Sequence, residues 1–252
     1  MPRQLQLLAC AVQFLTRVPV PLHGDFEPGL VTRAARYFPL VGQVVGLASA
    51  AAWLGALQLW PPALAGLAAV AVSVVITGAI HEDGLADTAD GLGGGATPEG
   101  RLEIMKDSRI GTYGVLALGL VIEVRIGALA TLSPVLGALV LVAGHGAARA
   151  ACLMAMRATP YTGNLQAARW TPADDPPSFG EFAAAALIAI WPFALLPQPV
   201  LFAGLAPALF FAWLTMLAAR RAIDGHTGDV LGAVEQVFEA VFLAGAAAVM
   251  RG

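Results

Sequence analysis

Three aspartates stand at helical spacing directly behind an uncharged stretch of the chain. Asp83, Asp87 and Asp90 follow residues 63–80, none of which carries a charge. If a helix continues through this stretch, its turn of about 100° per residue places the three carboxylates within about 60° of one another. Carboxylates so close repel one another, and a bound divalent cation removes that repulsion. A site with only oxygen ligands favours Mg²⁺, and Mn²⁺ or Ca²⁺ is also compatible with it. Because Mg²⁺ often binds a phosphate oxygen as well, the spacing predicts a metal site that binds a diphosphate.

A solvated helix end is the simpler alternative, because acidic side chains at such an end can face water without any ligand. The local crowding of charge weighs against it. Seven of the 17 acidic residues lie within residues 82–107, next to a run of three glycines at 93–95 and a group of basic residues. The metal site therefore remains the favoured interpretation.

The basic segment that follows supplies groups that bind phosphate. Lys106 and Arg109 flank Asp107, and Gly111 comes shortly after them. A guanidinium binds phosphate oxygens as a fork and an ammonium as a point charge, while glycine lets backbone approach a ligand closely. Anchoring of the next span by positive charge is the alternative, but it leaves the interleaved Asp107 unexplained. We expect these four residues to contact substrate.

A second cluster of acidic residues lies at the start of the last apolar segment and within it. Asp229 stands at the expected start of a helix, and Glu235 and Glu239 follow inside it at i, i+4 spacing. Ionisable groups at membrane depth usually face a polar cavity or a partner. Helix capping explains Asp229 equally well, since aspartate favours helix starts, but it does not explain Glu239.

Four more ionisable residues lie inside long apolar segments. They are Glu123, Arg125, His145 and Arg149. His145 and Arg149 share one helix face because they are four residues apart. We expect structural ion pairs here, in particular a pair between Glu123 and Arg149 that joins two adjacent spans.

The composition indicates an integral membrane protein. The chain is 58% hydrophobic and 12% charged, whereas soluble domains carry about 25% charged residues. The net charge of −3 and the absence of a dense basic stripe argue against a nucleic-acid binder. Two cysteines in apolar surroundings do not suggest a disulfide framework.

The hydropathy pattern predicts an all-α, polytopic bundle that forms a single membrane domain over residues 1–252. Basic residues gather in every second connecting segment, which predicts a cytoplasmic N-terminus and an outer C-terminus. The polar segments 81–111 and 220–239 then face the cytoplasm and hold any chemistry. About seven spans of roughly 20 residues are expected, at 38–60, 63–80, 112–132, 134–156, 182–196, 200–219 and 230–250.

Five blocks of this sequence together resemble one known family. They are "FLTRVPVP", "YFPLVGQVVG", "HEDGLADTADG", "EIMKDSRIGTYG" and "TGDVLGA" with the Gln and Glu that follow it. The blocks resemble, in order, those of the cobalamin synthase family of adenosylcobinamide-GDP ribazoletransferases. The resemblance implies a multi-pass enzyme of the inner membrane that needs Mg²⁺. It implies transfer of adenosylcobinamide phosphate from adenosylcobinamide-GDP to α-ribazole, or to its 5′-phosphate, with release of GMP; the protein could act as a homo-oligomer.

The resemblance also carries residue roles onto matching positions. It implies that the metal is bound by Asp83, Asp87, Asp90 and Asp229. It implies that these four aspartates act in catalysis together with Lys106 and Arg109. The residues implied to bind substrate are His81, Lys106, Asp107, Arg109, Gly111, Gln236 and Glu239.

The base that accepts the proton of the attacking hydroxyl stays open between His81, Asp90 and Asp229. On a regular helix His81 lies about 160° from the aspartate stripe, which counts against it. Two other functions also remain open. The segment "DTADG" faintly resembles the CDP-alcohol phosphotransferase signature, and a cation transporter would need carboxylates near the middle of the bilayer.

Overall fold

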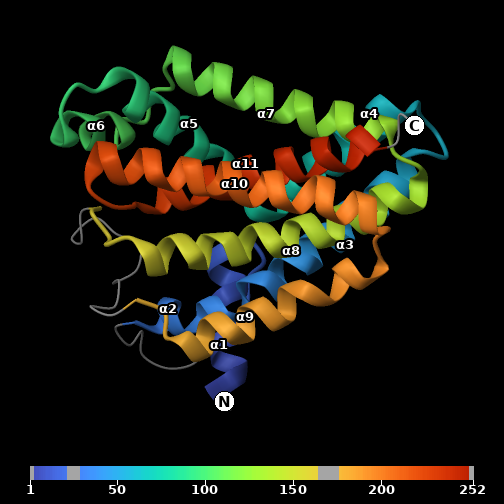
Figure 1. The fold of residues 1–252 in the computed structure, drawn as a ribbon, viewed down its shortest axis with the longest axis horizontal. Helices are drawn as coiled ribbons and strands as arrows, with labels where there is room; N and C mark the ends of the chain where they lie inside the picture. Colours follow the sequence, from blue (N-terminus) through green and yellow to red (C-terminus); the bar gives the residue numbers. More distant parts are fainter. Residues whose placement is uncertain (1–2, 22–28, 164–175, 250–252) are drawn as a thin grey trace.

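The computed structural model describes residues 3–21, 29–163 and 176–249, and every regular element among them is a helix (Figure 1). The all-α membrane bundle expected from the sequence is confirmed. In chain order the elements are α1 (Arg3–Leu15), α2 (Leu30–Ala34), η1 (Ala35–Tyr37), α3 (Phe38–Ala56), α4 (Pro62–Thr77), α5 (Ile80–Gly94), α6 (Pro98–Met105), α7 (Thr112–Thr131), α8 (Pro134–Ala158), α9 (Phe179–Ile190), η2 (Trp191–Leu195), α10 (Gln198–Ile223) and α11 (Gly228–Ala248).

Five helical segments among the described residues are long and apolar enough to cross a membrane. They are Leu30–Ala56, α7, α8, α10 and α11. The bent pair of α4 and α5 makes a sixth if it counts as one span, and the apolar helix Phe179–Leu195 is shorter. Each of the seven expected spans is therefore helical, while the number that cross the bilayer and the side of the N-terminus stay predictions.

Helices α8 and α11 form the centre of the bundle. Both are largely buried, whereas α7 and α10 leave most of their surface open. Small residues let the central helices pack closely: Gly137 on α8 lies against the ring of Trp53, whose Nε1 donates a hydrogen bond to the carbonyl of Pro134 at 3.0 Å. The open faces of α7 and α10 carry the large apolar side chains expected to meet lipid.

A sharp break separates α4 from α5, where the sequence predicts one continuous helix. The expectation of continuity was wrong: Gly78 (φ 67°) and Ala79 (φ 59°) both adopt left-handed backbone, and the two helices meet at 91°. This conformation is open to glycine but costs about 1 kcal/mol for an alanine. The Ala79 N–H donates to Val74 O at 2.9 Å and closes α4. The aspartate stripe nevertheless stays on one regular helix, because α5 begins before it.

The two ends of the bundle differ. Short connections follow α3, α7 and η2, and α11 ends at Ala248 on the same side of the bundle (Figure 1). Helix α6 lies at the opposite end, together with the starts of α7 and α11 (Figure 1). All predicted site residues therefore lie in the interior or toward the α6 end.

Candidate active site

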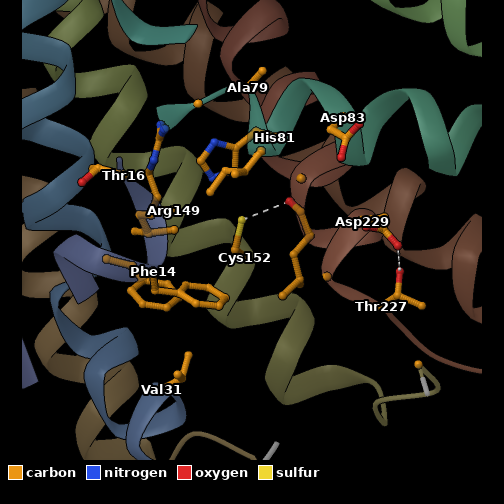
Figure 2. A pocket seen from close by; sticks show the side chains of 18 of the residues that line it. Phe14, Thr16, Val31, Ala79, His81, Asp83, Arg149, Cys152, Thr227 and Asp229 are labelled. Carbon is orange, nitrogen blue, oxygen red and sulfur yellow. Dashed lines mark hydrogen bonds between the residues drawn. The ribbon is translucent and has the colours of Figure 1, made fainter. Parts of the chain in front are cut away.

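A cavity of about 700 Å³ opens among α1, the break between α4 and α5, α6, α8 and the start of α11. Its polar lining includes Arg17, Asp83, Lys106, Arg149 and Asp229, so both signs of charge face one space (Figure 2). Segments far apart in the chain have to meet to form it. A space of this size accommodates a drug-sized ligand.

The acidic wall of the cavity combines α5 with the first turn of α11. Asp83 and Asp229 line the cavity from these two helices (Figure 2). Asp87 lies one turn along α5 and is within electrostatic reach of Asp83, Asp90 and Asp229. These four aspartates from two helices offer only oxygen donors, which is the ligand type that a hard divalent cation prefers. Among the described residues, three potential ligand atoms lie within 4.8 Å of one another only at His145, Glu235 and Glu239.

Thr227, and not Asp229, caps α11. The Thr227 Oγ1 accepts from the Val230 N–H at 3.3 Å and donates to Asp229 Oδ2 at 3.2 Å. The preceding residue, His226, is buried; burial lowers its pKa to about 4, so the ring is neutral at pH 7. Its backbone pairs with Pro160 and Thr162, which ties the start of α11 to the segment after α8. The capping alternative for Asp229 therefore does not apply.

Gly84 makes the acidic wall possible. A Cβ at this position would lie 2.7 Å from the carbonyl oxygen of Asp229 and 2.9 Å from its Cα. The backbones of α5 and α11 therefore touch at this residue, and a side chain would push the two groups of carboxylates apart. Gly232 on α11 packs on His81 in the same crossing.

Replacing Gly84 by alanine is expected to lower both thermal stability and activity. Overpacking against backbone costs about 1–3 kcal/mol, and the displaced Asp229 would no longer lie beside Asp83. Melting temperature in detergent and turnover by the purified variant measure the two effects. Gly119→Ala on α7 is the matched control, because its Cβ meets no atom within 4 Å. Equal behaviour of the two variants would contradict the close contact.

Asp90 joins two helices. Its Oδ2 accepts from the Gly111 N–H at 2.7 Å and its Oδ1 accepts from the Gly114 N–H at 2.9 Å. The carboxylate thereby satisfies free backbone donors at the start of α7. Asp90 is buried and is not part of the cavity lining among the described residues. The close backbone approach expected at Gly111 is present, and the group that approaches is Asp90.

The basic residues of the segment after α6 separate in the structure. Lys106 lines the cavity, whereas Arg109 turns to Asp107, with Nη2 2.5 Å from Oδ2. These hydrogen bonds from Arg109 lower the pKa of the Asp107 carboxyl to about 2. The Arg109 side chain is 86% exposed, and neither member of the pair is part of the cavity lining. Of the expected phosphate ligands, Lys106 alone faces the cavity.

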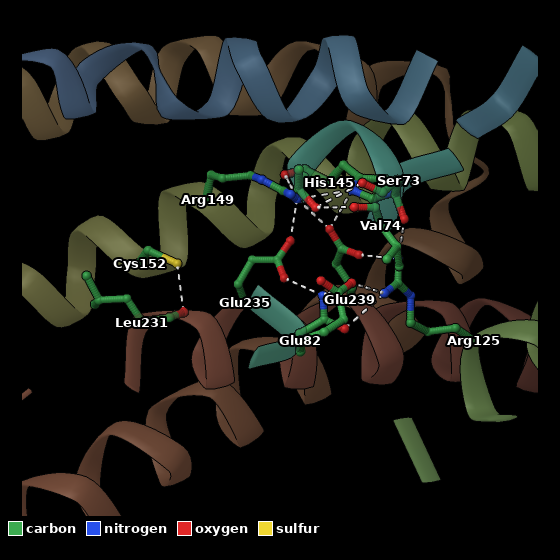
Figure 3. Close-up of polar contacts among 12 residues, drawn as sticks. Ser73, Val74, Glu82, Arg125, His145, Arg149, Cys152, Leu231, Glu235 and Glu239 are labelled. Atoms are coloured by element: carbon green, nitrogen blue, oxygen red, sulfur yellow. Dashed lines mark hydrogen bonds and ion pairs between the residues drawn. The ribbon is translucent and has the colours of Figure 1, made fainter. Parts of the chain in front are cut away.

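A buried ion network adjoins the cavity at Arg149 (Figure 3). It consists of Glu82, Arg125, His145, Arg149, Glu235, Gln236 and Glu239, which come from α5, α7, α8 and α11. All seven side chains are buried. Gln236 and Glu239, expected to bind substrate, lie in this network and are not part of the cavity lining.

Glu239 is the centre of the network. It contacts Arg149 Nη1 at 2.5 Å, Arg125 Nη2 at 2.8 Å and His145 Nδ1 at 2.6 Å, and Arg149 also contacts Glu235. Buried charges persist only when they are paired in this manner. The network therefore holds four helices in one arrangement.

The expected pair between Glu123 and Arg149 does not form. Glu123 is exposed on α7, and Arg149 pairs with the carboxylates of α11 instead. Residues two apart on a helix lie about 200° from each other, so with Arg125 facing inward Glu123 faces outward. The expectation of structural ion pairs for Arg125, His145 and Arg149 is confirmed.

Known proteins match this chain over almost its whole length. The sequence model of the cobalamin-5-phosphate synthase family matches residues 7–247. The chain belongs to this family. The relatives include an adenosylcobinamide-GDP ribazoletransferase of Bradyrhizobium diazoefficiens, 43% identical over 97% of this chain and 94% of the relative. Another, of Shewanella frigidimarina, is 40% identical over 94% of this chain and 92% of the relative. No solved structure matches.

The family match spans every described segment of the cavity wall, including some residues to which the sequence assigned no role. Arg17 lines the cavity without an earlier assignment, and Arg149 lines it although it was expected only to form a structural ion pair. His81 lines it as well, despite its angle to the aspartate stripe, because α5 begins at Ile80 and exposes its first turn to the cavity. Arg17 belongs to the "FLTRVPVP" block, which was the one available signal for its position.

Proposed function

We propose that this protein transfers adenosylcobinamide phosphate from adenosylcobinamide-GDP to α-ribazole, or to its 5′-phosphate, as the final step of cobalamin synthesis. Membership of the cobalamin-5-phosphate synthase family and the names of the relatives support these substrates. The observation that carries the proposal is the cavity where Asp83, Asp229 and Lys106 meet. The reaction needs such a site, because it rearranges a charged diphosphate.

In the proposed reaction, a hydroxyl oxygen of ribazole attacks the phosphorus attached to cobinamide. The bond from that phosphorus to the bridging oxygen breaks, GMP leaves with this oxygen, and the hydroxyl proton passes to a base. Positioning and neutralisation of charge supply most of the rate in such transfers. The cavity encloses acidic and basic groups on different helices, which suits both tasks.

Asp83, Asp87 and Asp229 are the residues proposed to hold Mg²⁺. Their donor set contains only oxygens, which fits the ion, and Asp83 and Asp229 both act electrostatically on Asp87. When bound, the ion would neutralise charge on the diphosphate oxygens. Asp90 was also predicted as a ligand; its two hydrogen bonds to the start of α7 favour a positioning role.

The remaining roles follow from the cavity lining. Lys106 is placed to stabilise the phosphate of the leaving GMP. His81 and Asp229 line the cavity and remain the candidate bases for the ribazole hydroxyl, whereas Asp90 is engaged at α7. Arg109 and Asp107 would contact substrate only if their mutual pair opens. We also propose that the cavity faces the cytoplasm at the inner membrane, as the distribution of basic residues suggests; a homo-oligomer stays a prediction.

The purified protein in detergent tests this function directly. Adenosylcobinamide-GDP is supplied with or without α-ribazole and with Mg²⁺ or EDTA, and GMP and the corrinoid product are quantified by chromatography. GMP release is expected only when both acceptor and divalent cation are present. GMP release without acceptor would indicate a hydrolase. Ion flux in vesicles without nucleotide chemistry would indicate a transporter.

A further inference from the structure

Arg17 is held at the break between α4 and α5. Its backbone N–H donates to Ile76 O at 2.8 Å. Its side chain covers Gly78, where a Cβ would lie 2.1 Å from Nε and 2.6 Å from Cγ. The left-handed glycine therefore makes room for the Arg17 side chain, which lines the cavity. Among the described residues no carboxylate pairs with it.

Further groups that attract anions lie at the same place. Helix α5 starts at Ile80 beside the cavity, and no side chain caps the free N–H groups of its first turn. Free N–H groups and the helix dipole favour an anion there. The His81 ring is buried apart from 6% of its surface, lines the cavity, and has no hydrogen-bond partner among the described residues. The first turn of α5 carries two acidic residues. Glu82 turns away and accepts a hydrogen bond from Gln236 at 3.0 Å, whereas Asp83 lines the cavity on the side of the proposed metal site.

The wall that carries Arg17 is also aromatic. Phe14, one turn earlier on α1, stacks on Phe38 with ring centroids 5.5 Å apart, and both rings line the cavity. Helix α1 packs on α2 and α3, whereas Lys106 and Asp229 enter from α6 and α11. Phe38 is 2% exposed, so this wall offers apolar contact and not an open face of both rings. The wall thus combines apolar contact with phosphate-binding groups, which fits a phosphorylated ligand whose phosphate lies at Arg17.

We propose that Arg17, with the N-terminus of α5, binds the phosphate of a phosphorylated acceptor, α-ribazole 5′-phosphate. The inference depends on the proposed function. The donor also contains a nucleotide, but its diphosphate belongs at Lys106 and the metal carboxylates, where GMP leaves. Arg17 is therefore expected to make the enzyme bind the phosphorylated acceptor more tightly than the unphosphorylated one. It is a binding residue for the substrate and not part of the reacting centre.

Steady-state kinetics of Arg17→Gln test the proposal. KM is measured for α-ribazole 5′-phosphate, for α-ribazole and for adenosylcobinamide-GDP. The KM for the phosphorylated acceptor is expected to rise at least about tenfold, because a charge-assisted, forked hydrogen bond is lost. The other two KM values are expected to stay within about twofold, since neither ligand places a phosphate at Arg17. Arg3→Gln, at the other, exposed end of α1, is the matched control for charge.

Several outcomes would overturn the proposal. They are an equal rise in KM for both acceptors, a rise for the donor alone, and a wild-type enzyme that does not bind α-ribazole 5′-phosphate saturably. If Arg17→Gln does not fold, as judged by its melting temperature in detergent, Arg17→Lys provides the same comparison. Lysine retains the charge without the fork, so a smaller rise confined to the phosphorylated acceptor is expected. A wild type that releases no GMP with either acceptor would refute the proposed function instead.

Discussion

Asp87→Asn is expected to reduce GMP release by at least about 100-fold while the protein remains folded and inserted. Asp87 lies among the carboxylates of Asp83, Asp90 and Asp229, which repel it. Asparagine keeps the shape of the side chain but removes the charge that would hold a divalent cation. The same loss of charge relieves repulsion in the absence of metal. The metal-free variant should therefore melt at the same temperature as the wild type or above it.

A titration with Mg²⁺ separates metal binding from general damage at this site. GMP release is measured against Mg²⁺ concentration for the wild type, Asp87→Asn and the control Glu99→Gln. Glu99 is an exposed acidic residue at the start of the neighbouring α6 and is not part of the cavity lining among the described residues. The control should respond to Mg²⁺ as the wild type does. Near-normal, Mg²⁺-dependent release by Asp87→Asn would refute the metal assignment.

Arg149→Met is expected to destabilise the protein by about 3–5 kcal/mol, the cost of leaving one partner of a buried ion pair uncompensated. Arg149 is 2% exposed and contacts both Glu235 and Glu239. Methionine fills much of the same volume without a charge, so the loss measures electrostatics more than packing. Unfolding by SDS or heat in detergent micelles gives the difference in stability.

Two further variants make the test of the network specific. Glu123→Gln should change stability by less than about 0.5 kcal/mol, because Glu123 is exposed on the outer face of α7. Adding Glu239→Gln to Arg149→Met should recover part of the lost stability, since it removes one of the two uncompensated carboxylates. Wild-type stability of Arg149→Met would show that the network does not hold the bundle together.

The structure confirms the expected placement of side chains where that placement depended on local helix geometry; the roles of these residues stay predictions. Asp83 and Asp87 lie on one regular helix, and their spacing alone places them on one face. The i, i+4 relation of Glu235 and Glu239 likewise places both on the side of α11 that meets Arg149. Such relations hold whenever the segment is helical, regardless of what packs against it.

The errors and omissions came from contacts between distant segments. The residues next to Asp90 in the chain do not show that the start of α7 packs against it. The residues next to Asp107 do not show that Arg109 pairs with it instead of facing the cavity. Arg17 stands more than 60 positions before Asp83 in the chain, yet both line one space. Pattern along the sequence cannot report such neighbours.

The sequence by itself determined that this is a helical membrane protein, which residues share a helix face, and which family it belongs to. The first two properties follow from composition and from the period of the α-helix, and the family follows from the five sequence blocks and the match of its sequence model. The tertiary structure alone decided which faces meet. In the structure the chain bends at Gly78 and Ala79, Arg149 pairs with carboxylates of α11, and Arg17 lines the cavity. These outcomes depend on close packing between helices. At Gly84, for example, the backbones of α5 and α11 can touch only because glycine has no Cβ.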